Sequence, residues 1–239
     1  MITLAIDTSE ARGSVALRRS GRVVGLRKHE SAEDYSSWLL PAVKEVLGEA
    51  GTKMEHLDLL GVSTGPGSFT GLRVGLTVVK AWAEVYEKRI VGVSRLEAMA
   101  ARVNDEPGYV AACYDAQRGQ MFGGLYRSNK EGKLERVEEE MVVTAGGFLE
   151  WVGKQAGAEA VKWVSLDPEL MTGLEGWRGR AARGDAMVKC GADLAGTICE
   201  IAEERAGRGE FSDVLMLDAN YVRRSDAEIF WKGPAGHAR

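Results

Sequence analysis

The sequence contains few residues that bind transition metals or form disulfides, and it has no long hydrophobic run. Its 239 residues include only three cysteines and three histidines, namely Cys113, Cys190, Cys199, His29, His56 and His237. An odd number of cysteines without CxxC spacing argues against a disulfide framework and against a zinc site. No stretch approaches the about 20 apolar residues of a membrane-spanning helix, so we expect no membrane span.

The sequence also lacks an excess of positive charge. Its 31 basic and 35 acidic side chains give a net charge of −4, which provides no overall field to hold a polyanion. We therefore expect nucleic acid to bind only where a partner supplies positive charge. The first residues include Asp7 and no basic segment followed by an apolar one, which argues against a signal peptide. These features predict a cytoplasmic protein.

Hydrophobic residues make up 45% of the chain, enough for a folded domain with a core. Short apolar runs over residues 2–6, 14–18 and 23–28 predict a meander of three strands. Apolar residues then recur at helical spacing over 33–50 and again over 70–87. The segments 57–63 and 89–93 predict further strands, so helices and strands alternate in this half.

The composition changes at residues 104–108, where two acids, a proline and a glycine predict a linker. Strand patterns dominate after it, including a charged edge strand over 134–143. We therefore predict two α/β lobes, residues 1–105 and 106–239, each a mixed sheet flanked by helices. The final helix, 191–207, is expected to pack back on the first lobe.

The segment Ser63–Gly75, STGPGSFTGLRVG, is the sharpest local feature. A strand leads into a glycine-rich turn that begins a helix, so backbone N–H groups could bind an anion there. The alternative is a tight turn in which Ser68 or Thr70 caps the helix. The segment lacks the Gly-Lys-Ser/Thr of a P-loop, so no lysine is placed to reach a phosphate.

The two first-lobe helices could form a surface for a partner. Gly71 and Gly75 share one helical face, and their spacing permits close packing against a neighbour. Trp38 lies outside the main apolar stripe of its own helix, which predicts an outward apolar patch. The candidate interface residues are Tyr35, Trp38, Leu39, Gly71, Leu72, Arg73, Gly75, Leu76 and Val79. A bulky residue at Gly75 is then expected to abolish pairing and leave the fold intact. The alternative is that both helices only cover the sheet.

Two acidic turns follow strand ends, one in each predicted lobe. They could hold the Mg²⁺ and phosphates of a nucleotide across a cleft. The candidate residues are Asp7, Thr8, Ser9, Asp115 and Arg118. An aspartate at a turn commonly has a structural role instead, through a bond to its own backbone.

Other catalytic patterns are absent from the sequence. His29 and Glu33 match only part of a HExxH zinc motif, because the second histidine is missing. No histidine can be paired with a nucleophile. We expect no catalytic site and no metal site in this chain. We do not expect a metalloprotease, because the sequence offers too few residues to ligate zinc.

Four segments together resemble the TsaB (YeaZ) family. They are Ile6–Ser9, Ser63–Arg73, Asp115–Gln120 and Tyr221–Arg224. The segment GPGSFTGLR is highly specific to the family, and the resemblance covers nearly the whole chain in consistent order. Two positions depart from the family pattern, since Gln117 and Gln120 stand where arginine and glutamate are common.

The resemblance implies the two-lobed fold of the actin, Hsp70 and sugar-kinase superfamily, with a reduced second lobe. It also implies a non-catalytic partner of the related subunit TsaD, which transfers a threonylcarbamoyl group to N6 of adenosine 37 in ANN-decoding tRNAs. Pairing with TsaD, or with a second copy, would use the first two helices. The ATPase TsaE would complete the machinery, and tRNA would be contacted only through the complex.

The resemblance implies no cofactor bound by this chain alone, with ATP or ADP at the interface of the complex. TsaD carries an HxxxH metal pair, and the corresponding positions here are His29 and Glu33. The rival hypothesis is an independent ATPase or small-molecule kinase that uses Asp7 and Asp115. The segment 170–183 has no clear glycine pair for adenosine, which disfavours that rival.

Overall fold

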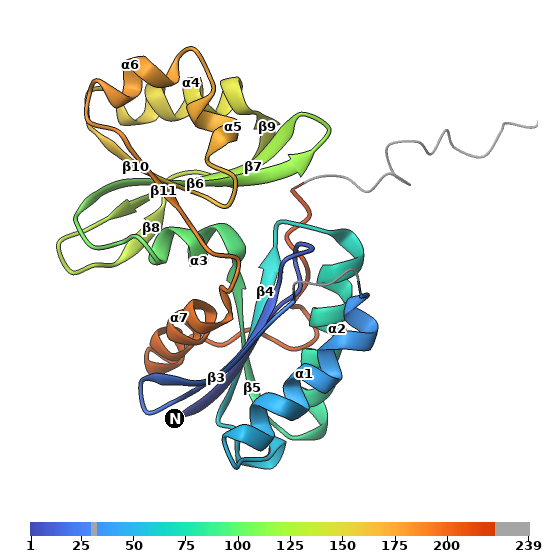
Figure 1. The fold of residues 1–239 in the computed structure, drawn as a ribbon. Helices are drawn as coiled ribbons and strands as arrows, with labels where there is room; N and C mark the ends of the chain where they lie inside the picture. Colours follow the sequence, from blue (N-terminus) through green and yellow to red (C-terminus); the bar gives the residue numbers. More distant parts are fainter. Residues whose placement is uncertain (30–32, 223–239) are drawn as a thin grey trace, which may run out of the picture.

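Two mixed sheets organise the protein, as the ribbon of the computed structural model shows (Figure 1). The structure describes residues 1–29 and 33–222. Arg223, Arg224 and His237 lie outside these residues, as do the residues between His29 and Glu33 in the HExxH-like stretch. Each sheet carries helices, so the prediction of two lobes built on mixed sheets is confirmed.

The first sheet has the strand order β3-β2-β1-β4-β5. Its strands are β1 (Ile2–Asp7), β2 (Ser14–Arg19), β3 (Arg22–Lys28), β4 (Leu59–Gly65) and β5 (Arg89–Ser94). The first three form the predicted antiparallel meander, while β4 and β5 run parallel to β1. The central strands β1 and β4 are buried along almost their whole length, because helices cover both faces of this sheet.

Helices α1 (Tyr35–Glu49) and α2 (Phe69–Val85) lie together on one face of the first sheet, and α7 (Ala195–Gly207) lies on the other (Figure 1). Their apolar stripes form cores with the sheet on both sides. The 3-10 turn η1 (Met54–His56) leads into β4. The predicted helices at 33–50 and 70–87 are confirmed by α1 and α2 within two residues at each end.

The second sheet has the order β11-β10-β6-β7-β8, and β9 also pairs with β7. Its strands are β6 (Gly108–Gln117), β7 (Gln120–Ser128), β8 (Leu134–Arg136), β9 (Met141–Thr144), β10 (Val161–Ser165) and β11 (Ala186–Lys189). The outer helices are α4 (Ala145–Ala156), α5 (Glu169–Thr172) and α6 (Trp177–Ala181), and α3 (Arg95–Ala101) lies between the sheets (Figure 1).

The prediction of one edge strand over 134–143 is wrong. The segment forms β8 and β9, which pair with different parts of β7. Between them Glu140 turns inward, where its carboxylate accepts hydrogen bonds from Tyr126 and Ser94. Burial raises the pKa of Glu140, although these donors act in the opposite direction.

The chain after α7 returns along the first lobe without forming a helix or strand. We call residues 210–222 the C-terminal strap. It makes one isolated bridge, between Ser212 and Ile90 of β5, and it ends beside the space between the lobes. No helix among residues 1–29 and 33–222 is long and apolar enough to cross a membrane.

Candidate functional site

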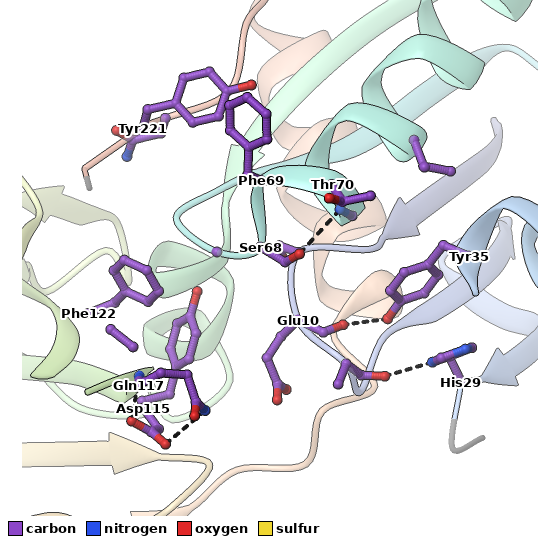
Figure 2. Close-up of a pocket in the computed structure, with 18 of the residues that line it drawn as sticks. Glu10, His29, Tyr35, Ser68, Phe69, Thr70, Asp115, Gln117, Phe122 and Tyr221 are labelled. Carbon is purple, nitrogen blue, oxygen red and sulfur yellow. Dashed lines mark hydrogen bonds between the residues drawn. The ribbon is translucent and has the colours of Figure 1, made fainter. Parts of the chain in front are cut away.

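A cleft of about 1030 Å³ lies between the two lobes. Its walls are the β1–β2 turn, the start of α1, the glycine-rich turn before α2, the β6–β7 turn and the end of the strap. Figure 2 shows His29 and Tyr35 on one side of this cleft and Asp115 and Gln117 on the other. The residues predicted for nucleotide binding lie in or beneath these walls.

Asp7 lies beneath the cleft rather than in it. The residue is fully buried at the end of β1, and its carboxylate pairs with the equally buried Arg95, with Nη1 3.1 Å from Oδ2. The Ser9 hydroxyl also donates to Asp7. Burial would lower the pKa of Arg95, but Asp7, Tyr114 and nearby Glu10 outweigh it and raise that pKa, so the guanidinium stays charged. The carboxylate that a magnesium ion would need is therefore already neutralised.

Thr8 and Ser9 are buried as well, and both hold the glycine-rich segment. The Thr8 hydroxyl donates to the Gly71 carbonyl at 2.7 Å, and the Ser68 N–H donates to the Ser9 carbonyl at 2.6 Å. A Cβ at Gly67 would lie 1.9 Å from the Ser9 oxygen. The glycine-rich turn is thus packed against the β1–β2 turn of its own chain.

Ser68 caps α2, as one of the two predictions for this segment required. Its side chain accepts a hydrogen bond from the Gly71 N–H at 3.3 Å, which satisfies one of the donors that an anion would otherwise use. The structure therefore favours the tight-turn interpretation over the anion site.

The second acidic turn is also shaped by its own contacts. Asp115 accepts hydrogen bonds from the Gln117 backbone N–H at 2.7 Å and from the Gln117 side chain at 3.0 Å. Gln117 and Arg118 both adopt positive φ, near 65° and 59°, which closes the tight turn from β6 to β7. Asp115, Arg118 and the buried Ser9 line the cleft, whereas Asp7 and Thr8 lie beneath it, so the structure does not present the five residues as one site.

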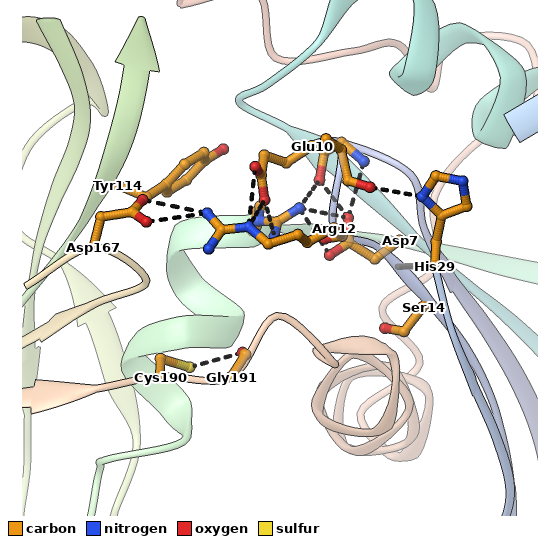
Figure 3. Close-up of polar contacts among 12 residues, drawn as sticks. Asp7, Glu10, Arg12, Ser14, His29, Tyr114, Asp167, Cys190 and Gly191 are labelled. Atoms are coloured by element: carbon orange, nitrogen blue, oxygen red, sulfur yellow. Dashed lines mark hydrogen bonds and ion pairs between the residues drawn. The ribbon is translucent and has the colours of Figure 1, made fainter. Parts of the chain in front are cut away.

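Three contacts across the cleft were not anticipated from the sequence. The Tyr114 hydroxyl of β6 donates to the Pro66 carbonyl, and Arg95 lies over the Tyr114 ring at 5.2 Å. Arg12 reaches Asp167 of the second lobe at 3.2 Å (Figure 3). Burial raises the pKa of Tyr114, so its phenol remains a hydrogen-bond donor. The only signal in the sequence was a basic residue, Arg95, at the start of a short helix that is apolar apart from Arg95 and Glu97.

His29 has a structural role. Its Nδ1 lies 2.6 Å from the Ala11 carbonyl oxygen and its Nε2 lies 2.7 Å from the Glu33 carbonyl oxygen. The ring also packs against Tyr35 and Trp38, at centroid distances of 4.3 and 5.0 Å. Both ring nitrogens are therefore engaged with the backbone. Among the residues that the structure describes, no three His, Cys, Asp or Glu side chains gather in a way that could hold a metal ion.

Six of the nine predicted interface residues lie inside the protein, so the structure does not offer their side chains to a partner. They are Leu39, Gly71, Leu72, Gly75, Leu76 and Val79. A Cβ at Gly71 would lie 2.1 Å from the Thr8 carbonyl oxygen, and one at Gly75 would lie 2.4 Å from the Thr8 hydroxyl. The two glycines permit close packing as predicted, but against the chain's own β1–β2 turn.

The other three predicted residues remain accessible in part. Tyr35 and Trp38 are half-buried, and Trp38 packs against His29, Tyr35 and the first-lobe core. Arg73 is exposed, lies 3.7 Å from the Phe69 ring centroid, and donates to the Tyr221 hydroxyl at 3.1 Å.

The outward sides of α1 and α2 carry apolar residues that the sequence reading missed. Leu40 on α1 is 52% exposed and Val85 on α2 is 72% exposed. Val74, Val78 and Ala81 share a side of α2 with Val85 and are exposed in whole or in part. We call these five residues the α1–α2 face. Exposed apolar residues gathered on neighbouring helices are typical of a protein interface.

Nearly the whole chain is similar in sequence to known proteins. A model of the TsaD family, described as tRNA N6-adenosine threonylcarbamoyltransferase, matches residues 22–166. The tRNA threonylcarbamoyladenosine biosynthesis protein TsaB of Bacillus subtilis (strain 168) is 30% identical over 238 residues, which cover 97% of this chain and 98% of that protein.

Solved structures agree with the fold. A Pseudomonas aeruginosa protein described as similar to the peptidase YEAZ superposes with a TM-score of 0.74 and 26% identity, over 93% of this chain and 99% of that one. The ROK hexokinase of Thermus thermophilus superposes with a TM-score of 0.51 and 12% identity, over 87% of this chain and all of that one. These likenesses confirm the actin-like two-lobed fold.

Proposed function

The chain belongs to the TsaB family, and from this premise we propose that it acts in the biosynthesis of threonylcarbamoyladenosine in tRNA as the non-catalytic partner of a TsaD-family chain. The complex would transfer a threonylcarbamoyl group to N6 of adenosine 37 in ANN-decoding tRNAs. The observation that carries the proposal is the match of nearly the whole chain to a TsaB protein.

The polar groups around the cleft support a non-catalytic role. Asp7 is neutralised by Arg95, Asp115 accepts hydrogen bonds from Gln117, and His29 is held between two backbone carbonyls. General acid–base or metal chemistry needs side chains that can reach a substrate. In this proposal TsaD supplies those groups.

The α1–α2 face supports pairing. Interfaces combine an apolar centre with aromatic and arginine anchors, and Trp38 and Arg73 lie on the same two helices as Leu40 and Val85. We propose that TsaD binds this face in the cell and that a second copy binds it when TsaD is absent. TsaE, tRNA, and ATP or ADP would be engaged at the assembled complex, since this chain carries a net charge of −4.

The test replaces two exposed residues of the face, Leu40→Glu together with Val85→Glu. Two carboxylates buried against a partner without counter-charges should weaken binding to the TsaD chain of the same organism by more than about a hundredfold. The double variant should also fail to restore threonylcarbamoyladenosine in the tRNA of cells depleted of the wild-type chain. Calorimetry measures the binding, and mass spectrometry of digested tRNA measures the modification.

Val24→Glu is the matched control, because Val24 is 42% exposed on β3, at the opposite edge of the first sheet from β5. It should bind TsaD and support modification like the wild-type chain. Unchanged modification after depletion of the wild-type chain would refute the proposed function. Normal binding by the double variant would refute the assignment of the face.

The rival function, an independent ATPase or kinase, needs Asp7 or Asp115 to hold a magnesium-bound nucleotide. Calorimetry with Mg-ATP on the purified chain separates the two hypotheses. We expect no micromolar binding and no turnover, because the Asp7 carboxylate is fully buried in its pair with Arg95. Tight binding with turnover would favour the rival.

A further inference from the structure

The C-terminal strap is held firmly although it forms no regular element. At its beginning, the Ser212 N–H donates to the Ile90 carbonyl at 2.9 Å and the Ser212 hydroxyl accepts from the Gly92 N–H at 3.0 Å. At its end, the Asn220 N–H donates to the Thr64 carbonyl at 2.7 Å, and the Asn220 side chain donates to Glu140 at 2.6 Å. The strap is therefore fixed to β4 and β5 and to the second lobe.

The middle of the strap is a tight turn attached to α2. Asp213 accepts hydrogen bonds from the N–H groups of Leu215 and Met216 at 2.8 and 3.0 Å. Lys80 of α2 donates to the carbonyls of Leu215 and Leu217 at 3.2 and 3.0 Å. The aspartate and the lysine together set the conformation of this turn.

The turn presents two large apolar side chains to solvent. Leu215 is 84% exposed and Met216 is 80% exposed, the two highest values among the large hydrophobic residues described. Val214, Leu217 and Ala219 instead pack against the first-lobe core. The inward residues anchor the turn, so the outward pair is displayed in a fixed geometry. Such preorganisation lowers the entropy lost on binding.

A contact beside the α1–α2 face would enlarge the surface that the two helices offer to a partner. Helices of 15 and 17 residues are about 22 and 25 Å long at about 1.5 Å per residue. Two of them side by side, about 10 Å apart, present roughly 500 Å² of flat area. A stable interface takes about 800 Å² of accessible surface from each partner, so the two helices alone would form a small to standard-sized contact. The strap turn, bonded to α2 through Lys80, adjoins this area.

We propose that Leu215 and Met216 form a third contact of the partner surface, and that the TsaD-family chain covers them with an apolar pocket. Asp213 and Asp218 flank the pair and are exposed, so the pocket is expected to have basic side chains at its rim. This inference rests on the proposed function, because it extends the surface through which the chain would bind TsaD.

The experiment compares binding to purified TsaD for the wild-type chain, for the strap variant Leu215→Ser/Met216→Ser, and for Val24→Ser. The strap variant should bind at least about tenfold more weakly. Its thermal unfolding midpoint should not change, because both side chains are already in solvent. Val24→Ser, an exposed valine on β3, should bind like the wild-type chain. Raised salt should weaken wild-type binding if basic groups surround the pocket.

The face variant Leu40→Glu/Val85→Glu separates the two proposals. If it loses binding while the strap variant binds within about twofold of the wild-type chain, the strap inference is wrong and the proposed function stands. If the wild-type chain does not bind TsaD, both are wrong. If the strap variant dissociates a homodimer in light scattering but binds TsaD normally, a second copy covers the turn and the assignment to TsaD is overturned.

Discussion

Arg95→Met is expected to destabilise the protein by about 3–5 kcal/mol, because it leaves a buried carboxylate without its counter-charge. Arg95 and Asp7 are both fully buried, and their ion pair is 3.1 Å long. Arg95 also donates to the Arg12 carbonyl at 3.2 Å and to the Ser9 hydroxyl at 3.1 Å. Methionine fills part of the space but replaces none of these hydrogen bonds.

Urea denaturation measures the loss in the free energy of unfolding. The double variant Asp7→Asn/Arg95→Met should recover part of the loss, because the remaining amide carries no charge. Arg127→Met is the matched control. Its pair with Glu159 is about half exposed on both sides, so its stability should equal that of the wild type. A stability of Arg95→Met equal to that of Arg127→Met would show that the buried pair does not hold the fold.

Gly75→Leu is expected to destabilise the folded chain by about 1–3 kcal/mol or more, rather than to block pairing in an intact fold. A Cβ at this position would lie 2.4 Å from the Thr8 hydroxyl oxygen. The larger side chain would push α2 away from the β1–β2 turn. That movement would break the 2.7 Å hydrogen bond from Thr8 to the Gly71 carbonyl.

Gly48→Leu tests the same change on the neighbouring helix. Gly48 is exposed on α1, and a Cβ there would meet nothing within 4 Å. Since glycine inside a helix costs about 0.5–1 kcal/mol relative to alanine, this control should be at least as stable as the wild type. Thermal unfolding of both variants checks the pair. A Gly75→Leu chain that unfolds at the wild-type temperature would contradict the packing seen here.

Local patterns predicted most of the fold. Helical periodicity located α1 and α2, and short apolar runs located the meander of β1, β2 and β3. These predictions succeed because side-chain burial repeats every 3.6 residues in a helix and every two in a strand. Capping by Ser68 was also predictable, since the side chain of a serine that precedes a helix commonly accepts a hydrogen bond from a backbone N–H of the first turn.

The candidate site was less predictable, because its contacts join residues far apart in the chain. Asp7 meets Arg95 88 residues later, and nothing near either residue indicates the other. The spacing of Gly71 and Gly75 correctly indicated close packing but could not identify the neighbour. That neighbour is Thr8 of the same chain. The exposed residues Leu40 and Val85 fit the helical spacing of the buried residues less clearly, so the buried pattern did not point to them.

The conformation of the strap could not be predicted from the sequence, for a different reason. Residues 210–222 show neither period, and their conformation is set by individual hydrogen bonds to residues of other elements, including Lys80, Thr64 and Ile90. Such bonds form only when those other elements have reached their final positions.

The bond from Tyr114 to the Pro66 carbonyl has a mechanical consequence. Pro66 belongs to the loop that precedes α2, so this hydrogen bond from β6 of the second sheet restrains the start of that helix. Without this hydrogen bond, we expect the first lobe to keep its secondary structure, while the orientation of α2 on the first sheet becomes less restricted. The second lobe thus stabilises the position of α2, one of the two helices that we propose bind a partner.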